Sequence, residues 1–228
     1  MTPGPSGGVG EAVPRRLDDM DATVPPTVPT RRWSTGLIPA HPARAAITMV
    51  AFTVVLYLIE LVDQLSRLQL DQYGIVSRRV SGLDGIVWAP LLHGGWPHLL
   101  ANTIPFLVFG FLVMAGGIRQ FLLVTALIWV VSGIGVWLIG PSNAVTVGMS
   151  GVIFGWLVFL LARGLFARNW GQVALGIVLF AVWGSILFGV LPGRPDVSWQ
   201  GHLFGAIAGL LAAMIVGRAD RPRAVAAG

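Results

Sequence analysis

Six runs of apolar residues, separated by short polar or Gly- and Pro-rich breaks, follow one another along this chain. A helix rises 1.5 Å per residue, so roughly 20 residues cross a hydrocarbon core about 30 Å thick. The pattern therefore predicts six membrane-spanning helices, at Ala45–Val62, Leu99–Met114, Phe121–Ile139, Val147–Leu161, Val173–Val190 and Leu203–Val216.

The remaining segments are predicted from their polarity. Residues 1–42 are rich in Pro, Gly, Thr and charge, which is typical of a disordered tail. They precede a single membrane domain over residues 43–217, and a short basic tail covers residues 218–228. Glu60 and Asp63 stand at the far end of the first predicted helix, where we expect water to solvate both carboxylates.

The long connection between the first two predicted helices, residues 65–97, changes character halfway. Its first half is polar, but Gly85–Leu92 is too apolar for an aqueous loop. Trp88 and Trp96 are of the residue type that anchors at the headgroup layer. We therefore expect short helices lying partly in the membrane interface.

Composition agrees with a protein of the membrane. Apolar residues make up 55% of the chain and charged residues 11%, whereas soluble domains carry about 25% charged residues. The absence of cysteine excludes disulfides and thiolate metal sites. The net charge of +5 belongs mainly to tails and loops, so it bears on orientation and gives no reason to expect nucleic-acid binding.

Arginine placement predicts the orientation, because positive residues favour the cytoplasmic side. With six helices both termini lie on one side, and we predict that this side is cytoplasmic. The inside would then hold eleven of the fifteen arginines and the outside four, namely Arg67, Arg78, Arg79 and Arg194. The predicted location is a bacterial cell membrane.

This orientation brings four polar residues to one depth, because the second, fourth and sixth helices all run from outside to inside. His98 and Asn102 begin the second helix, Ser150 the fourth and His202 the sixth. Histidine is uncommon inside a span and indicates a functional site. We therefore expect one site just below the outer surface.

Small residues at a spacing of four allow two of these helices to approach closely. The fourth helix carries Gly151 and Gly155, and the sixth carries Gly201, Gly205 and Gly209. If the two stripes face each other, Ser150 and His202 flank the same contact.

A serine and a histidine in contact can perform nucleophilic catalysis, because the imidazole accepts the hydroxyl proton and later delivers it to the leaving group. We expect a Ser150–His202 dyad, with the imidazole lying against Phe154. The predicted oxyanion donors are the His98 and Asn102 side chains, one turn apart, and the Ser150 backbone N–H at a helix start.

Three motifs together resemble the rhomboid family of intramembrane serine proteases. They are His98-Leu-Leu-Ala-Asn102, Gly148-Met-Ser150-Gly151 and His202-Leu-Phe-Gly205-Ala-Ile-Ala-Gly209. The resemblance covers about residues 45–216. It implies an all-α, six-helix bundle with an embedded first loop, and a serine endopeptidase that cleaves transmembrane or membrane-anchored substrates near the outer face.

The resemblance also implies the same dyad and oxyanion groups, with no cofactor and no metal. The glycines at 148, 151, 205 and 209 would support the packing. Two features depart from the family pattern: the first loop lacks a Trp-Arg pair, and Phe154 stands where the family often has Tyr.

Two other functions are considered. A catalytically silent rhomboid-like protein would bind transmembrane segments without cleaving them, but such relatives usually lack the Ser or the His. A metal site of His93, His98 and His202 would lack the His-Glu-x-x-His arrangement and a nearby acidic base.

Overall fold

A computed structural model of the protein describes residues 36–66, 68–193 and 197–221, together with residues 1, 2 and 4. The chain divides into two units, Met1–Arg31 and Arg32–Gly228, and every element described below belongs to the second. Most of the tail predicted over residues 1–42, and residues 222–228 of the C-terminal tail, lie outside the described residues.

Six helices in the described part of the chain are long and apolar enough to cross a membrane. This confirms the predicted all-α, six-span architecture. Most of them extend a few residues beyond the apolar runs, because their first and last turns include polar and aromatic residues. They are α1 (Pro42–Ser66), α3 (Trp96–Val113, continued by η5, Met114–Gly116), α4 (Ile118–Ile139), α5 (Ser150–Ala167), α6 (Trp170–Trp183, continued by η6, Gly184–Val190) and α7 (Trp199–Ala219).

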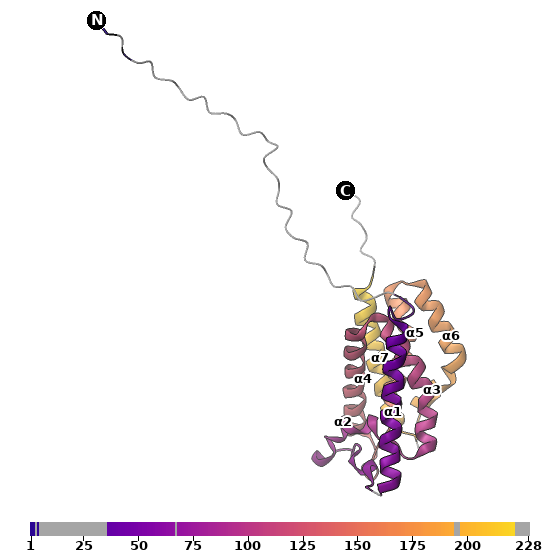
Figure 1. Ribbon diagram of the computed structural model, residues 1–228. Helices are drawn as coiled ribbons and strands as arrows, with labels where there is room; N and C mark the ends of the chain where they lie inside the picture. The colour runs from indigo at the N-terminus through magenta and orange to yellow at the C-terminus, as the bar shows by residue number, and fades with distance from the viewer. Residues whose placement is uncertain (3, 5–35, 67, 194–196, 222–228) are drawn as a thin grey trace. The chain divides into compact units, whose positions relative to one another are not determined.

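Helix α5 is the centre of the bundle. It packs most extensively against α7 and also against α3, α4 and α6. Of its apolar window, 67% is buried, compared with 22% for α1 and 11% for α6 with η6. Its Trp156, Leu157 and Phe159 are among the most deeply buried side chains. Figure 1 shows α6 at one edge of the bundle and α1 in front of it. The central helix is also the one that begins with Ser150.

Local sequence explains where three of these helices begin. Gly148 has φ +116, a conformation that favours glycine, and it turns the chain into α5. The Asn169 side chain accepts a hydrogen bond from the Gln172 N–H at the start of α6, at 3.1 Å. Ser198 does the same for α7, accepting from the Gly201 N–H at 3.3 Å. Both are N-caps, which satisfy an otherwise unpaired N–H of the first turn.

The first connection contains short helices, as its mixed polarity predicted. They are η2 (Leu70–Tyr73), η3 (Val80–Gly82), α2 (Gly85–Trp88) and η4 (Ala89–Leu91).

This loop is hydrogen-bonded to the end of α4 and to the turn before α5. Ile75 and Thr146 form a two-way backbone bridge at 2.9 Å. The Gly148 N–H donates to the Ala89 carbonyl at 2.7 Å. The first loop therefore fixes the segment that leads into Ser150.

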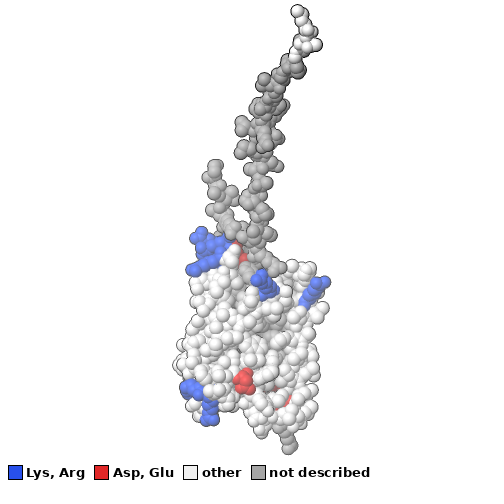
Figure 2. Space-filling model, turned by 90° about the vertical axis from the view of Figure 1, so that its left-hand side faces the viewer, with Lys and Arg blue, Asp and Glu red and all other residues white. Residues whose placement is uncertain are grey.

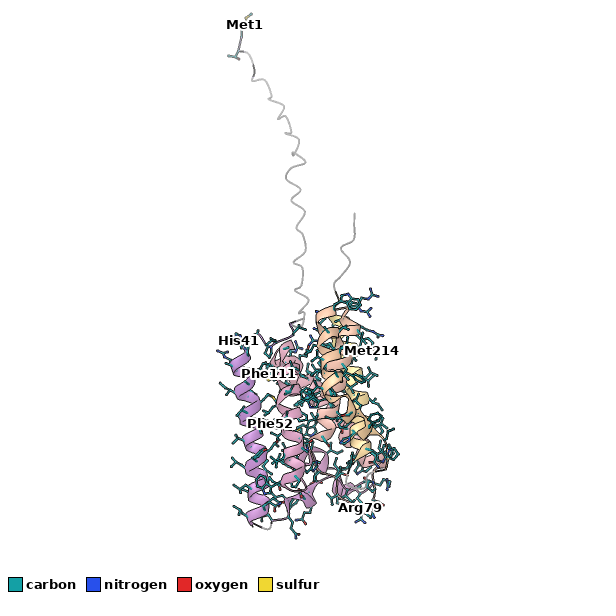
Figure 3. All side chains as sticks on the ribbon, turned by 90° about the vertical axis from the view of Figure 1, so that its right-hand side faces the viewer. Met1, His41, Phe52, Arg79, Phe111 and Met214 are labelled. Atoms are coloured by element: carbon teal, nitrogen blue, oxygen red, sulfur yellow. The ribbon has the colours of Figure 1, made fainter. Side chains whose placement is uncertain are left out.

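Charged side chains on the face shown in Figure 2 lie near the two ends of the bundle, and the middle is free of them. This distribution suits a protein whose middle lies in hydrocarbon. Figure 3 shows His41, just before α1, and Arg79, in the first loop, at opposite ends, with Phe52 between them.

One expectation about charge was wrong. Glu60 is only 2% exposed, and its Oε1 accepts a hydrogen bond from the Gln64 side chain at 2.9 Å. The first loop folds back over the end of α1, where the Leu70 N–H donates to Asp63. A carboxylate that the linear sequence placed in water is therefore covered by protein.

Candidate active site

Ser150 and His202 come from different helices and meet at one end of the bundle. The Ser150 Oγ and the His202 Nε2 are 2.9 Å apart, which is hydrogen-bond distance. The imidazole stacks on the Phe154 ring, with centroids 3.8 Å apart and planes inclined by 8°. His202 and Phe154 are buried, whereas Ser150 is partly exposed and can be approached. The two groups that nucleophilic catalysis needs are thus in contact.

Facing glycine stripes on α5 and α7 bring the two helices together. A Cβ placed on Gly205 would lie 2.1 Å from the Gly151 carbonyl oxygen, and one on Gly209 would lie 2.1 Å from the Gly155 oxygen. Neither position has room for a side chain. Because Gly151 follows Ser150 directly and Gly205 is about one turn from His202, this close packing sets the distance between hydroxyl and imidazole.

His98, in the first turn of α3, lies against the turn that precedes Ser150. A Cβ placed on Gly148 would lie 2.8 Å from the His98 Nε2. The His98 Nδ1 accepts a long hydrogen bond, 3.4 Å, from the Gly94 N–H. An accepting Nδ1 carries no proton, so the neutral ring holds its proton on Nε2. His98 therefore presents an N–H donor toward the Gly148 turn.

Asn102 lies one turn further along α3, on the same side as His98. Its side chain is buried, with 8% exposure. Its amide nitrogen Nδ2 has no hydrogen-bond partner among the described residues. An unpaired buried amide is costly, so this N–H is a candidate donor to a bound group.

His93 lies beside the site without joining the dyad. Its ring is 2% exposed and meets the His98 ring edge to face, with centroids 5.2 Å apart. Burial and, to a lesser degree, the neighbouring His98 lower the pKa of His93 to about 3, so this ring is neutral at pH 7. Within the described ranges no three His, Cys, Asp or Glu side chains gather as a metal-ligand group.

A small cavity of about 30 Å³ adjoins Ser150. Ser132 and Ser198 are among the residues that line it. A site that holds one water needs roughly 10–15 Å³, so the cavity has room for water.

Two contacts of the site are absent from the sequence prediction. The Ser132 Oγ on α4 donates to the Gly201 carbonyl at 2.8 Å and fixes the start of α7. The Gly189 carbonyl lies 3.0 Å from the His202 Nδ1. Ser132-Gly133, a pair of small residues inside an apolar run, was a weak sequence signal for the contact between Ser132 and Gly201. A backbone carbonyl gives no signal, because every residue has one.

Comparison with known proteins identifies the family. Residues 81–219 match the family model of the Rhomboid domain, and this range contains Ser150, His202, His98 and Asn102. The chain is 47% identical over 182 residues to an uncharacterized protein of Mycobacterium tuberculosis, covering 76% of each chain. It is 45% identical over 198 residues to an uncharacterized protein of Mycobacterium leprae, covering 83% of this chain and 75% of the relative.

A more distant relative is Rhomboid-like protease 5 of Toxoplasma gondii. It is 35% identical over 134 residues, which are 55% of this chain and 15% of that protein. The family match covers more than half of the chain and coincides with the helices that carry the polar cluster. With six apolar helices, the protein is an integral, multi-pass membrane protein. The chain belongs to the rhomboid family.

Proposed function

We propose that this protein is an intramembrane serine endopeptidase that cleaves membrane-spanning or membrane-anchored protein substrates. The observation that carries the proposal is the 2.9 Å contact between the Ser150 Oγ and the His202 Nε2. Family membership supports the same reaction class. A non-catalytic rhomboid-like protein would have no need of a paired nucleophile and base.

In the first half of the reaction, the Ser150 Oγ attacks the scissile carbonyl while its proton passes to the His202 Nε2. The developing oxyanion takes hydrogen bonds from the His98 Nε2–H, the Asn102 amide and the first-turn backbone N–H of Ser150. The tetrahedral intermediate then breaks its C–N bond. His202 returns the proton to the leaving amine, and an ester joins the Ser150 Oγ to the acyl fragment.

Water completes the second half. His202 takes a proton from a water molecule, whose oxygen attacks the ester carbonyl. The C–Oγ bond breaks, and the proton returns to the Ser150 Oγ. The cavity beside Ser150, whose lining includes Ser132 and Ser198, supports this step because it has room for water.

The proposed orientation puts the dyad near the outer face and both termini in the cytoplasm. Among the described residues, Arg44, Arg119 and Arg218 lie at the ends of α1, α4 and α7 that are opposite Ser150, which supports that assignment. A substrate helix must then expose an extended backbone near the outer surface to reach Ser150.

Active-site labelling tests the proposal. A fluorophosphonate should label the purified wild-type protein, and Ser150→Ala should remove both the labelling and the cleavage of a helical membrane substrate. Ser142→Ala, at an exposed serine in the loop before α5, is the matched control and should keep both. Persistent cleavage by folded Ser150→Ala would exclude the proposed mechanism and leave the non-catalytic function as the alternative.

A further inference from the structure

The side of the dyad histidine that faces away from Ser150 meets the backbone of η6. The His202 Nδ1 and the Gly189 carbonyl oxygen are 3.0 Å apart. A carbonyl oxygen can only accept a hydrogen bond, so the Nδ1 must carry the proton. In the neutral ring the Nε2 then bears the lone pair, and this is the atom 2.9 Å from the Ser150 Oγ. The contact selects the tautomer that a general base requires.

Many serine hydrolases assign this task to a buried carboxylate, which holds the imidazole in one tautomer and orientation. His202 forms no ion pair with a carboxylate in the described part of the chain. The Gly189 carbonyl occupies the corresponding place. A backbone carbonyl is a known partner for the Nδ1–H of a functional histidine.

The residue at position 189 must also be small. A Cβ placed on Gly189 would lie 2.8 Å from the Phe154 Cζ and 3.0 Å from the His202 Nδ1. Both distances are shorter than ordinary van der Waals contact, so a side chain would push against the stacked pair. The imidazole is thus held at its face by Phe154, at Nε2 by Ser150 and at Nδ1 by Gly189.

We propose that Gly189 is a positioning residue of the active site, whose carbonyl orients His202 and fixes its tautomer in place of a triad acid. The proposal rests on the Ser150–His202 dyad as the catalytic pair. The acceptor sits on a thinly covered element, because only 11% of the α6–η6 window is buried. His202 can therefore act as a base only while η6 remains packed against α7.

The direct test uses the wild-type protein in detergent with ¹⁵N-labelled histidine. NMR of the ring nitrogens at neutral pH should show the His202 Nδ1 protonated and the Nε2 unprotonated, with His202→Gln used to assign the signals. A wild-type ring with its proton on Nε2 would overturn the proposal. This measurement needs no catalysis, so it remains informative even if Ser150 proves unreactive.

The functional test uses Gly189→Ala, with Ser185→Ala as the control. Ser185 lies in the same η6 segment but is exposed. We expect Gly189→Ala to lower kcat at least tenfold with KM within twofold, to slow fluorophosphonate labelling in parallel, and to mix the two His202 tautomers. Ser185→Ala should match wild type in all three. Wild-type kcat and an unchanged tautomer in Gly189→Ala, or equal losses in Ser185→Ala, would refute a positioning role.

Discussion

Gly205→Ala tests whether the distance between Ser150 and His202 is set by the packing of α5 on α7. The added Cβ would lie 2.1 Å from the Gly151 carbonyl oxygen, whereas ordinary contact begins at 3.4 Å. The two helices must therefore separate locally by about 1.3 Å, the difference between these distances. Neither partner can yield by a side-chain rotation, because the obstructing atom belongs to the backbone.

This separation changes the distance between Ser150 and His202, because Gly151 and Gly205 each lie within about one turn of one of these residues. A Ser150–His202 distance of 2.9 Å would lengthen to about 4 Å, beyond hydrogen-bond reach. A misplacement of about 1 Å commonly costs on the order of 10²-fold in rate, and overpacking destabilises by about 1–3 kcal/mol. We expect kcat to fall about a hundredfold and thermal stability to fall moderately.

The assay compares cleavage, fluorophosphonate labelling and thermal unfolding in reconstituted protein. Gly171→Ala is the matched control and should keep wild-type activity, because its new Cβ would come only 0.1 Å inside ordinary contact, at 3.3 Å from the Asn169 side-chain oxygen. If Gly205→Ala kept wild-type kcat and labelling rate, the glycine contact could not be what sets the distance within the dyad.

Three further predictions concern other parts of the protein. Asn102→Ala should lower kcat by about 10²-fold or more with little change in KM, as expected for an oxyanion donor; a change in KM alone would contradict that role. Burial, followed by the nearby Asp63 and Glu60, raises the pKa of Asp71 from 3.8 to about 6. The fold therefore favours the protonated carboxyl, so stability should decline as pH rises from about 4 to about 6, and Asp71→Asn should flatten that decline in thermal melts. In this cysteine-free chain, a membrane-impermeant maleimide added to intact cells should label Arg79→Cys and spare His41→Cys; the reverse pattern would invert the proposed orientation.

The membrane architecture could be predicted from the sequence because bilayer thickness imposes a length on every apolar run. The six predicted spans and the short helices of the first loop are confirmed. Helix ends were less predictable, since Trp96 and Trp199 begin helices although each precedes its apolar run. Glu60 was placed wrongly, because burial by a loop that folds back over the helix end leaves no mark on the local hydropathy pattern.

The sequence was enough to predict which side chains form the site, but not which main-chain groups hold the two imidazoles. Ser150, His202, His98 and Asn102 stand out as polar residues in apolar surroundings, and their roles remain predictions until variants are measured. The partners of the two imidazoles at Nδ1, the Gly94 N–H for His98 and the Gly189 carbonyl for His202, are main-chain groups. Only folding in three dimensions decides which main-chain groups meet a ring nitrogen.

The bridge between Ile75 and Thr146 and the bond from the Gly148 N–H to the Ala89 carbonyl have a mechanical consequence. They join the first loop to the turn before Ser150, so a displacement of the loop is transmitted to that turn through these main-chain hydrogen bonds. A substitution in the first loop that weakens these hydrogen bonds would thus shift the Ser150 hydroxyl without changing any residue that contacts it.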